Sequence, residues 1–213
     1  MSKSRVQITV KKETLRASGA SVWVNCPGST KIKSGKWPFA DNGAAVFGNA
    51  VHNAASAILQ NKRIELSVQE ELQKNERLED FENYLKFYLN AVENWGLQGG
   101  QKIIEQYRAI EFEKYIIAGT MDYAVLICEN ESVKLQIIDL KTGFVPVDVN
   151  DNLQLFVYVH LILLNLPAKF LKNKAVSIES IIVQPAQNIV KMSNISYNPE
   201  RFKTLYNISN KRE

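Results

Sequence analysis

The sequence has little cysteine, no long apolar run and no strong excess of charge, and each of these absences argues against a class of protein. Its two cysteines, Cys26 and Cys128, form no C-x-x-C pair, so a disulfide framework, a zinc cluster and a cysteine-ligated iron–sulfur cluster are unsupported. The longest apolar stretch, residues 153–166, is too short to span a membrane and contains His160 and Asn165. The net charge of +4 permits a polyanionic partner but does not demand one.

The N-terminal segment Met1–Arg5 lacks the apolar stretch of a signal peptide, so we expect a cytoplasmic, reducing compartment. The chain of 213 residues, 46% hydrophobic and 23% charged, has the composition of an ordinary globular protein. No repeat or interdomain linker divides it. We therefore expect a single domain over residues 1–213, with an N-terminal helical part (1–100) and a core of strands and helices (101–213).

The hydrophobic periodicity predicts helices, then three strands, a helix, one or two strands and a last helix. The expected helices cover residues 18–26, 43–61, 76–95, 153–164 and 200–209. The expected strands cover residues 102–117, 119–127, 133–141, 178–184 and 189–197, with a short N-terminal strand at 6–10. The first of them is either straight or bent. In this interpretation Gly119 begins the second core strand, and Ser18 or Ser21 caps the first helix.

The stretch Ile137–Gly143 is a hydrophobic strand that ends in charged residues. Side chains alternate along a strand, so Leu140 faces one side while Asp139 and Lys141 face the other together. Charged groups beside a hydrophobic strand are costly unless they are paired or bind a metal. Taken alone, the pair fits a plain ion pair at a strand end at least as well as a functional site, since such pairs are common and weak.

A second carboxylate, Asp122, lies near the start of the preceding strand. If the two strands form an antiparallel hairpin, Asp122 and Asp139 converge, and two carboxylates repel unless a cation lies between them. Oxygen-rich sites suit Mg²⁺ or Mn²⁺. A neighbouring lysine can orient or deprotonate a water, or stabilise a developing negative charge. These are the parts that metal-assisted phosphodiester hydrolysis requires.

These motifs resemble the PD-(D/E)xK nuclease superfamily, and more narrowly its RecB-type exonuclease branch with phage-encoded relatives. The ordered set is Gly48–His52, Glu105, Gly119–Asp122, Ile138–Gly143, and Gln154 with Tyr158. An uncharacterised phage family of this branch is also similar in Ser18–Ala20, Trp23, Asn25–Ser29 and Gln184–Pro185. The resemblance runs from about residue 18 to 185. It implies an α/β, restriction-endonuclease-like αβββαβ core with a mixed central sheet flanked by helices, plus an N-terminal helical region.

Carried over residue by residue, the resemblance implies a site for Mg²⁺ or Mn²⁺. His52, Asp122 and Asp139 would ligate the metal, together with the backbone carbonyl of Leu140. Glu105 would bind a second metal or orient the catalytic lysine. The absence of clustered cysteines excludes the iron–sulfur cluster that some relatives carry.

The same resemblance gives Lys141 the role of positioning or activating the attacking water. Gln154 and Tyr158 lie four residues apart on one helix face and would support the site or contact DNA. For Tyr158, helix packing is an equally good interpretation. The basic loop 27–42, with Trp37 and Phe39 among its lysines, fits a nucleic-acid contact and a solvated loop equally well.

The implied function is a metal-dependent deoxyribonuclease, with an exonuclease favoured over an endonuclease, in phage or bacterial DNA recombination, repair or processing. We expect DNA as its partner in the cytoplasm of a bacterial or phage-infected cell. No helicase motif is present, so a recombinase, single-strand-binding protein or helicase would be a separate chain. The alternatives are a non-catalytic nucleic-acid-binding or assembly module on a nuclease fold, and a structural protein whose strand ends form ion pairs. Degenerate nucleases normally lose the acid or the lysine, and this sequence keeps both.

Overall fold

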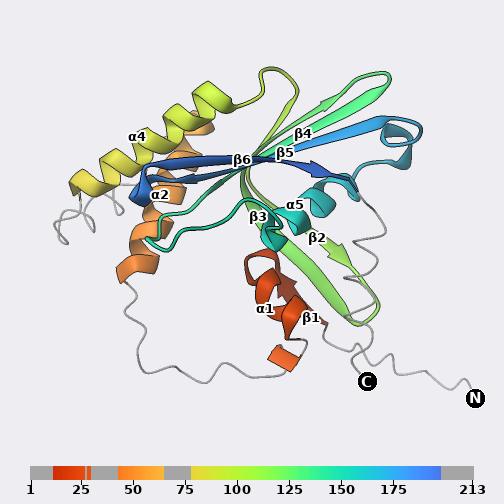
Figure 1. The fold of residues 1–213 in the computed structure, drawn as a ribbon, viewed down its shortest axis with the longest axis horizontal. Coiled ribbons are helices and arrows are strands. Elements are labelled where there is room, and N and C mark those ends of the chain that lie inside the picture. The colour runs from red at the N-terminus through yellow and green to blue at the C-terminus, as the bar shows by residue number, and fades with distance from the viewer. Residues whose placement is uncertain (1–11, 27, 30–42, 65–77, 198–213) are drawn as a thin grey trace, which may run out of the picture.

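The computed structural model describes residues 12–26, 28–29, 43–64 and 78–197, which form a mixed sheet with helices on its two faces (Figure 1). The strands are β1 (Glu13–Arg16), β2 (Gln101–Glu111), β3 (Tyr115–Cys128), β4 (Ser132–Leu140), β5 (Ala175–Gln184) and β6 (Ile189–Ser196). The α-helices are α1 (Ala20–Asn25), α2 (Gly43–Leu59), α4 (Leu78–Trp95) and α5 (Leu153–Leu163). The expected mixed central sheet flanked by helices is confirmed, and the elements from α4 to β5 follow in the order αβββαβ.

The sheet has the strand order β1-β3-β4-β5-β6, with β2 paired to β3 as well. Its β2–β3, β3–β4 and β5–β6 pairs are antiparallel, whereas β1–β3 and β4–β5 are parallel. A parallel pair needs a long crossover connection, and α5 provides it between β4 and β5. The end of β4, where Asp139 lies, is therefore followed directly by the connection that leads into α5.

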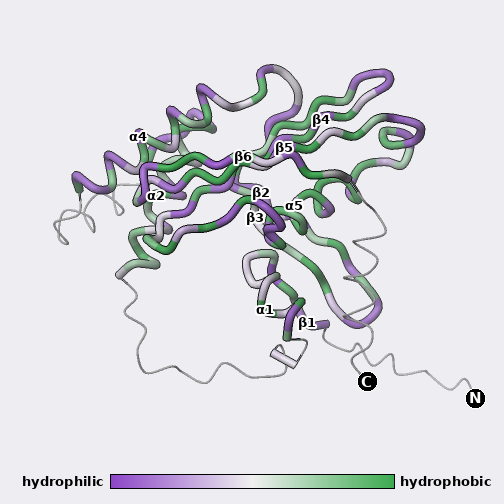
Figure 2. The backbone as a smooth tube through the Cα atoms, in the orientation of Figure 1, coloured by the Kyte–Doolittle hydropathy of each residue, from purple (hydrophilic) through white to green (hydrophobic). Residues whose placement is uncertain are grey.

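Two hydrophobic cores fill the spaces between the sheet and its helices. The side chains of α5 from Leu155 to Leu163 are all buried, which explains why this helix is apolar on every side. On the other face α2 and α4 pack through one stripe each, so α4 keeps a charged outer surface. Figure 2 shows α4 with purple and green residues alternating along the helix. Among the described helices, none is both long and apolar enough to cross a membrane.

One edge of β3 is divided between two partners. β1 pairs with Tyr115–Ala118, whereas β4 pairs with Tyr123–Cys128. Gly119–Asp122 lie between these two ladders, and no described strand pairs with them on that side. Backbone and side-chain polar groups at such a gap must find other partners, so the gap is a suitable place for polar chemistry.

The alternation of side chains also changes at this gap. Ile117 and Met121 belong to the core beneath α5, yet Tyr123 and Val125 belong to the core beneath α2 and α4. The β2–β3 ladder is unpaired at the same step, where Glu105 faces Asp122 across the two strands. Glu105 has a φ of +47°, a left-handed conformation that is strained for a residue with a side chain. The interruption directs two carboxylates away from the regular pleat, as β-bulges near active sites do.

The structure corrects several element boundaries. The expected strand over residues 102–117 is divided, because the chain turns at Phe112–Lys114 and β3 begins at Tyr115. Gly119 is thus inside β3 instead of beginning it. No side-chain cap from Ser18 or Ser21 forms at α1, which begins after a 3-10 turn at Ala17–Gly19.

The strand β1 was not predicted, although it pairs with the core of the sheet. It is only four residues long, too short for its alternation to stand out in the sequence. The expected strand at 6–10 and helix at 200–209 lie outside the described residues, as does nearly all of the loop 27–42.

Candidate functional site

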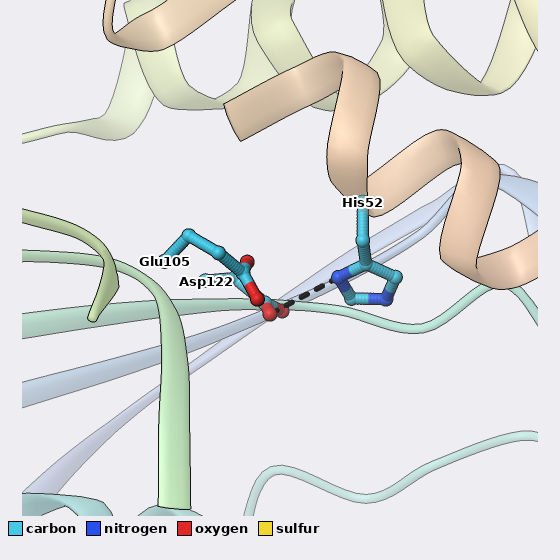
Figure 3. Close-up of side chains that lie close together, drawn as sticks. All are labelled: His52, Glu105 and Asp122. Atoms are coloured by element: carbon cyan, nitrogen blue, oxygen red, sulfur yellow. Dashed lines mark hydrogen bonds and ion pairs between the residues drawn. The ribbon is translucent and has the colours of Figure 1, made fainter. Parts of the chain in front are cut away.

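Three potential metal ligands from three elements converge beside the gap in β3. His52 projects from α2 toward Glu105 on β2 and Asp122 on β3, as Figure 3 shows. One ligand atom of each residue lies within 4.8 Å of the others. His52 reaches this position because it neighbours the buried stripe of α2, which fixes the helix against the sheet.

Both carboxylate oxygens of Asp122 have partners. Its Oδ1 lies 3.0 Å from Nδ1 of His52. Its Oδ2 accepts a hydrogen bond of 2.8 Å from the backbone amide of Leu140. The register pairs Tyr123 with Ile138, so the next step along the two strands sets Asp122 opposite Asp139, as an antiparallel hairpin requires. The convergence of these two acids at one end of the hairpin follows from this register.

A second cluster joins Asp139 and Lys141 to α5. Asp139 is 2% exposed, and its Oδ2 lies 2.6 Å from Nζ of Lys141. Gln154 bridges the pair, since its Oε1 accepts from Nζ at 3.0 Å and its Nε2 donates to Oδ1 of Asp139 at 3.1 Å. The same Nε2 donates to the hydroxyl of Tyr158 at 2.8 Å. A buried ion pair needs such additional hydrogen bonds to offset the cost of desolvation.

The start of α5 places Gln154 at this pair. Asn152 caps the helix, because its side-chain oxygen accepts from the amides of Gln154 at 3.0 Å and Leu155 at 3.2 Å. Tyr158 lies one turn further along the helix, on the same face. The lysine is held through its own backbone as well, since its amide donates to the carbonyl of Val183 at 2.9 Å.

Gly119 permits the approach of α5 to β3. A Cβ atom at this position would lie 2.7 Å from Cε1 of Tyr158 and 2.8 Å from Cβ of Ala17, closer than atoms can pack. The glycine of the G-x-x-D motif is therefore required by the aromatic ring above it. Tyr158 packs against β3 at Gly119, and its hydroxyl accepts a hydrogen bond from Nε2 of Gln154.

Two acids of the site, Asp139 and Glu105, have a pKa above the ordinary value of their side chain. Burial, opposed by Lys141 and reinforced by the charge of Asp122, raises the pKa of Asp139 to about 6. Burial and then the charge of Asp122 raise the pKa of Glu105. Burial disfavours the protonated form of His52, but the hydrogen bond and charge of Asp122 outweigh it and raise its pKa. These directions are those of a crowded negative site that a cation would relieve.

The donor set fits a divalent cation. Carboxylates and an imidazole are the ligands that Mn²⁺ and related ions accept, and no cysteine takes part. Among the described residues, Lys141 is the only partner that reaches Oδ2 of Asp139, so this oxygen can exchange the lysine for an ion. Among the described residues, His52, Glu105 and Asp122 each offer one ligand atom to a common point that could hold a metal ion.

The structure places the predicted residues in two adjoining groups. His52, Glu105 and Asp122 form the first, and Asp139, Lys141, Gln154 and Tyr158 form the second. Leu140 contacts Asp122 through its amide, whereas the sequence analysis proposed a role for its carbonyl. Glu105 lies with His52 and Asp122, and this favours the metal-binding alternative over the orientation of Lys141. The roles themselves stay predictions.

Sequence reasoning missed Tyr88 of α4. This side chain is 1% exposed, and its hydroxyl has no hydrogen-bond partner among the described residues. Burial raises its pKa well above the usual range, and the charges of Asp122 and Asp139 raise it further. Periodicity assigned Tyr88 to the hydrophobic stripe of its helix, and only the fold reveals that its hydroxyl lies near the acids.

A surface cavity of about 500 Å³ opens next to the gap in β3. It is lined by Thr14, Arg16, Ala17, Ser18, Tyr107, Ala118, Gly119, Thr120 and Tyr158. One wall is Tyr158, which also belongs to the lysine cluster, and Tyr107 is paired with Thr120 across β2 and β3. Arg16, several hydroxyl groups and two aromatic rings therefore line a cavity that adjoins the lysine cluster at Tyr158.

Residues 13–209 match the model of a family described as "Protein of unknown function (DUF2800)". The crystal structure of SSO0001 is similar, with 12% identity and a TM-score of 0.37 over 95% of this chain and 77% of that chain. A crystal structure from Eubacterium rectale with the name "Putative exonuclease" is also similar, with 11% identity and a TM-score of 0.41 over 94% of this chain and 79% of that chain. No curated protein matches the sequence.

Proposed function

Since the chain belongs to the DUF2800 family, whose function is unknown, its site must indicate its activity, and we propose that it is a divalent-metal-dependent deoxyribonuclease. The observation that carries the proposal is the position of the Asp139–Lys141 pair directly beside the convergent His52, Glu105 and Asp122. One group offers ligands for a cation, and the other offers the positive charge of a lysine held by two partners. Phosphodiester hydrolysis needs both.

His52, Asp122 and Asp139 are the proposed ligands of Mg²⁺ or Mn²⁺, with the carbonyl of Leu140 as a further donor. Glu105 joins them on the side of β2, where its strained backbone aims its carboxylate at the same point. When bound, the cation supplies charge neutralisation for the phosphate and lowers the pKa of water. The raised pKa values of Asp139 and Glu105 support a site that is incomplete without positive charge.

Lys141 is the proposed group that positions the attacking water. Its ammonium group lies between Asp139 and Gln154 at 2.6 and 3.0 Å, so it is directed at the site by two partners. Water attacks the phosphorus, the bond to the 3′-oxygen breaks, and this oxygen takes a proton. The products are a 5′-phosphate and a 3′-hydroxyl.

Gln154 and Tyr158 are proposed positioning residues. Gln154 contacts both members of the ion pair, and Tyr158 holds the amide of Gln154 in place. Arg16, Ser18 and Thr120, which line the neighbouring cavity, offer a cation and hydroxyl groups for the phosphates of a bound strand. Attack at a strand end, as an exonuclease, is the form of the activity that we favour.

The test is incubation of end-labelled linear and circular DNA, single- and double-stranded, with Mg²⁺ or Mn²⁺. The proposal predicts metal-dependent release of nucleotides from linear DNA, and no release by Asp139→Ala or Lys141→Ala variants that remain folded. Cutting of circular DNA would reject a strict exonuclease. Undiminished cleavage by Asp139→Ala would reject the assignment of the site. Binding of DNA without cleavage would favour a non-catalytic module on the same fold.

A further inference from the structure

Two apolar side chains are presented to solvent immediately after the catalytic motif. Phe144 and Val145 are 67% and 79% exposed, the highest values among the large hydrophobic side chains of the described residues. They follow Lys141 by three and four positions. Single exposed apolar residues are common, but an adjacent pair beside a candidate active site suggests contact with a ligand.

The backbone that carries these side chains is firmly held. Gln184, 1% exposed at the end of β5, donates to the carbonyls of Gly143 and Val145, both at 2.7 Å, and accepts from the amide of Val147 at 3.1 Å. We call the segment Gly143–Val147 the apolar loop. Because all three hydrogen bonds join this buried glutamine to one loop, they fix the backbone conformation of the loop.

Two further side chains hold the apolar loop from neighbouring elements. Gln187 donates to the carbonyl of Phe144 at 2.6 Å, and Lys191 of β6 donates to the carbonyl of Val147 at 2.9 Å. The loop therefore presents Phe144 on a fixed backbone, and ordering it costs little entropy when a ligand binds. An exposed aromatic ring on a rigid support is the arrangement that stacking requires.

The apolar loop lies next to α2, the helix that carries His52. A Cβ atom at Gly48 would lie 2.8 Å from Oγ1 of Thr142, so this glycine lets the helix approach the residue that joins Lys141 to the loop. Neither α2 nor residues 141–147 contain an Asp or Glu, whereas α4 has Glu79 and Asp80 in its first turn. The surface around Phe144 thus accepts a polyanion without repulsion from these two segments.

We propose that the apolar loop contacts the terminal bases of DNA, with Phe144 stacked on the base next to the scissile phosphate and Val145 packed against its neighbour. This inference rests on the proposed function. Every base has a π-face, so an aromatic ring at this position can stack on a strand end without sequence preference. Two side chains are too few for a stable protein interface, which buries about 800 Å² on each partner.

The test compares Phe144→Ala with wild-type protein and with two controls. Leu164→Ala removes a side chain that is also exposed but lies beyond the far end of α5. Phe144→Trp restores an aromatic ring. Three quantities are measured with linear duplex DNA that carries 2-aminopurine as the terminal base of either strand. They are the KM and kcat of Mn²⁺-dependent cleavage, and the 2-aminopurine fluorescence on binding without added metal.

We expect Phe144→Ala to raise the KM about 5- to 150-fold, the loss of one base–aromatic stack, with kcat within about threefold of wild type. The fluorescence change should disappear in this variant and persist in Phe144→Trp and Leu164→Ala. Gln184→Leu, which frees the backbone of the apolar loop, should raise the KM in the same direction. Unchanged thermal unfolding of Phe144→Ala excludes a folding defect.

Three results would overturn the inference. If Phe144→Ala has the wild-type KM and the wild-type fluorescence change on binding, the apolar loop does not contact the terminal bases, although the nuclease assignment stands. If wild-type protein neither binds nor cleaves DNA, the proposed function and this inference fail together. If Phe144→Ala changes the molecular mass in light scattering while its KM is unchanged, the loop is a contact between copies of the chain.

Discussion

The backbone amide of Leu140 donates a hydrogen bond of 2.8 Å to Oδ2 of Asp122, and this bond joins the two halves of the site. Asp122 belongs to the group with His52, whereas Asp139 and Lys141 flank Leu140 on β4. Because the bond comes from the backbone of a buried residue, β4 cannot move along β3 without displacing both groups. The site is thus built on neighbouring strands, whose geometry is more precise than that of a flexible loop.

The G-x-x-D glycine gives a prediction about packing. Gly119→Ala would place a methyl group within 3 Å of Tyr158 and Ala17, so α5 must shift from β3. We expect a loss of about 1–3 kcal/mol in the free energy of unfolding, typical of overpacking. The rate of cleavage should fall with it, because Tyr158 holds Gln154 against the ion pair. Urea unfolding and initial cleavage rates measure the two effects.

Gly143 provides a matched control for this substitution. It closes the D-x-K motif, but a Cβ atom added there would meet nothing within 4 Å. Gly143→Ala should therefore unfold at nearly the wild-type urea concentration. Equal stability of both glycine variants would contradict the packing that we describe for Gly119.

Replacing Glu105, whose backbone is strained, with glycine should stabilise the protein and lower its activity. A left-handed residue with a side chain costs about 1–2 kcal/mol, whereas glycine in a strand costs about 0.5–1 kcal/mol. Glu105→Gly should accordingly unfold at the same or a higher temperature than wild type while its Mn²⁺ affinity falls. Glu105→Gln keeps the strain and removes the charge. If it stabilises the protein as much as glycine does, charge repulsion and not backbone strain is the cause.

The metal-free protein should lose stability as the pH rises from about 4 to above 7. Asp139 keeps its proton in the folded state up to about pH 6, whereas an unfolded aspartate loses it near pH 4. The folded state therefore binds more protons in this interval, and the free energy of unfolding falls as pH increases. The raised pKa of Glu105 has the same sign.

The raised pKa of His52 extends this decline above pH 6.5, since its stabilisation is complete below the unfolded value and is lost as pH rises through the folded one. Mn²⁺ competes with these protons, so it should raise the unfolding temperature more at pH 8 than at pH 5.5. Thermal unfolding with EDTA and with Mn²⁺ at both pH values checks the prediction. A metal-free stability that rises over this interval would contradict it.

Sequence reasoning identified the helices and most strands of the sheet because their hydrophobic periods are long and clear. It also placed Asp122 near Asp139, since an antiparallel hairpin brings the start of one strand to the end of the next. It allowed a bend within residues 102–117 but did not divide them into two strands, because the turn at Phe112–Lys114 has neither glycine nor proline. Gly119 was interpreted as the start of a strand. A glycine is needed there because the ring of Tyr158, distant in sequence, packs against it.

Hydrophobic periodicity does not predict the finer geometry of the site. The change in alternation at Asp122 and the left-handed backbone of Glu105 arise where β2 and β3 pair. The residue pattern of one strand alone does not predict how it pairs with its neighbour. The hydrogen bonds from Gln184 to the apolar loop join β5 to the connection after β4, segments about 40 residues apart, so periodicity does not predict them. Tyr88 lies in the regular apolar stripe of α4, so periodicity predicts its burial but not the position of its hydroxyl.

The central claim is that a divalent cation held beside the Asp139–Lys141 pair makes this protein hydrolyse DNA. The most direct measurement is the rate of nucleotide release from end-labelled linear DNA as a function of Mn²⁺ concentration, for wild type and Asp122→Asn. We predict a saturable dependence on Mn²⁺ for wild type, abolished by EDTA, and at least a hundredfold lower rate for Asp122→Asn at the same Mn²⁺ concentration. A rate that is independent of metal, or equal in the two proteins, would contradict the account.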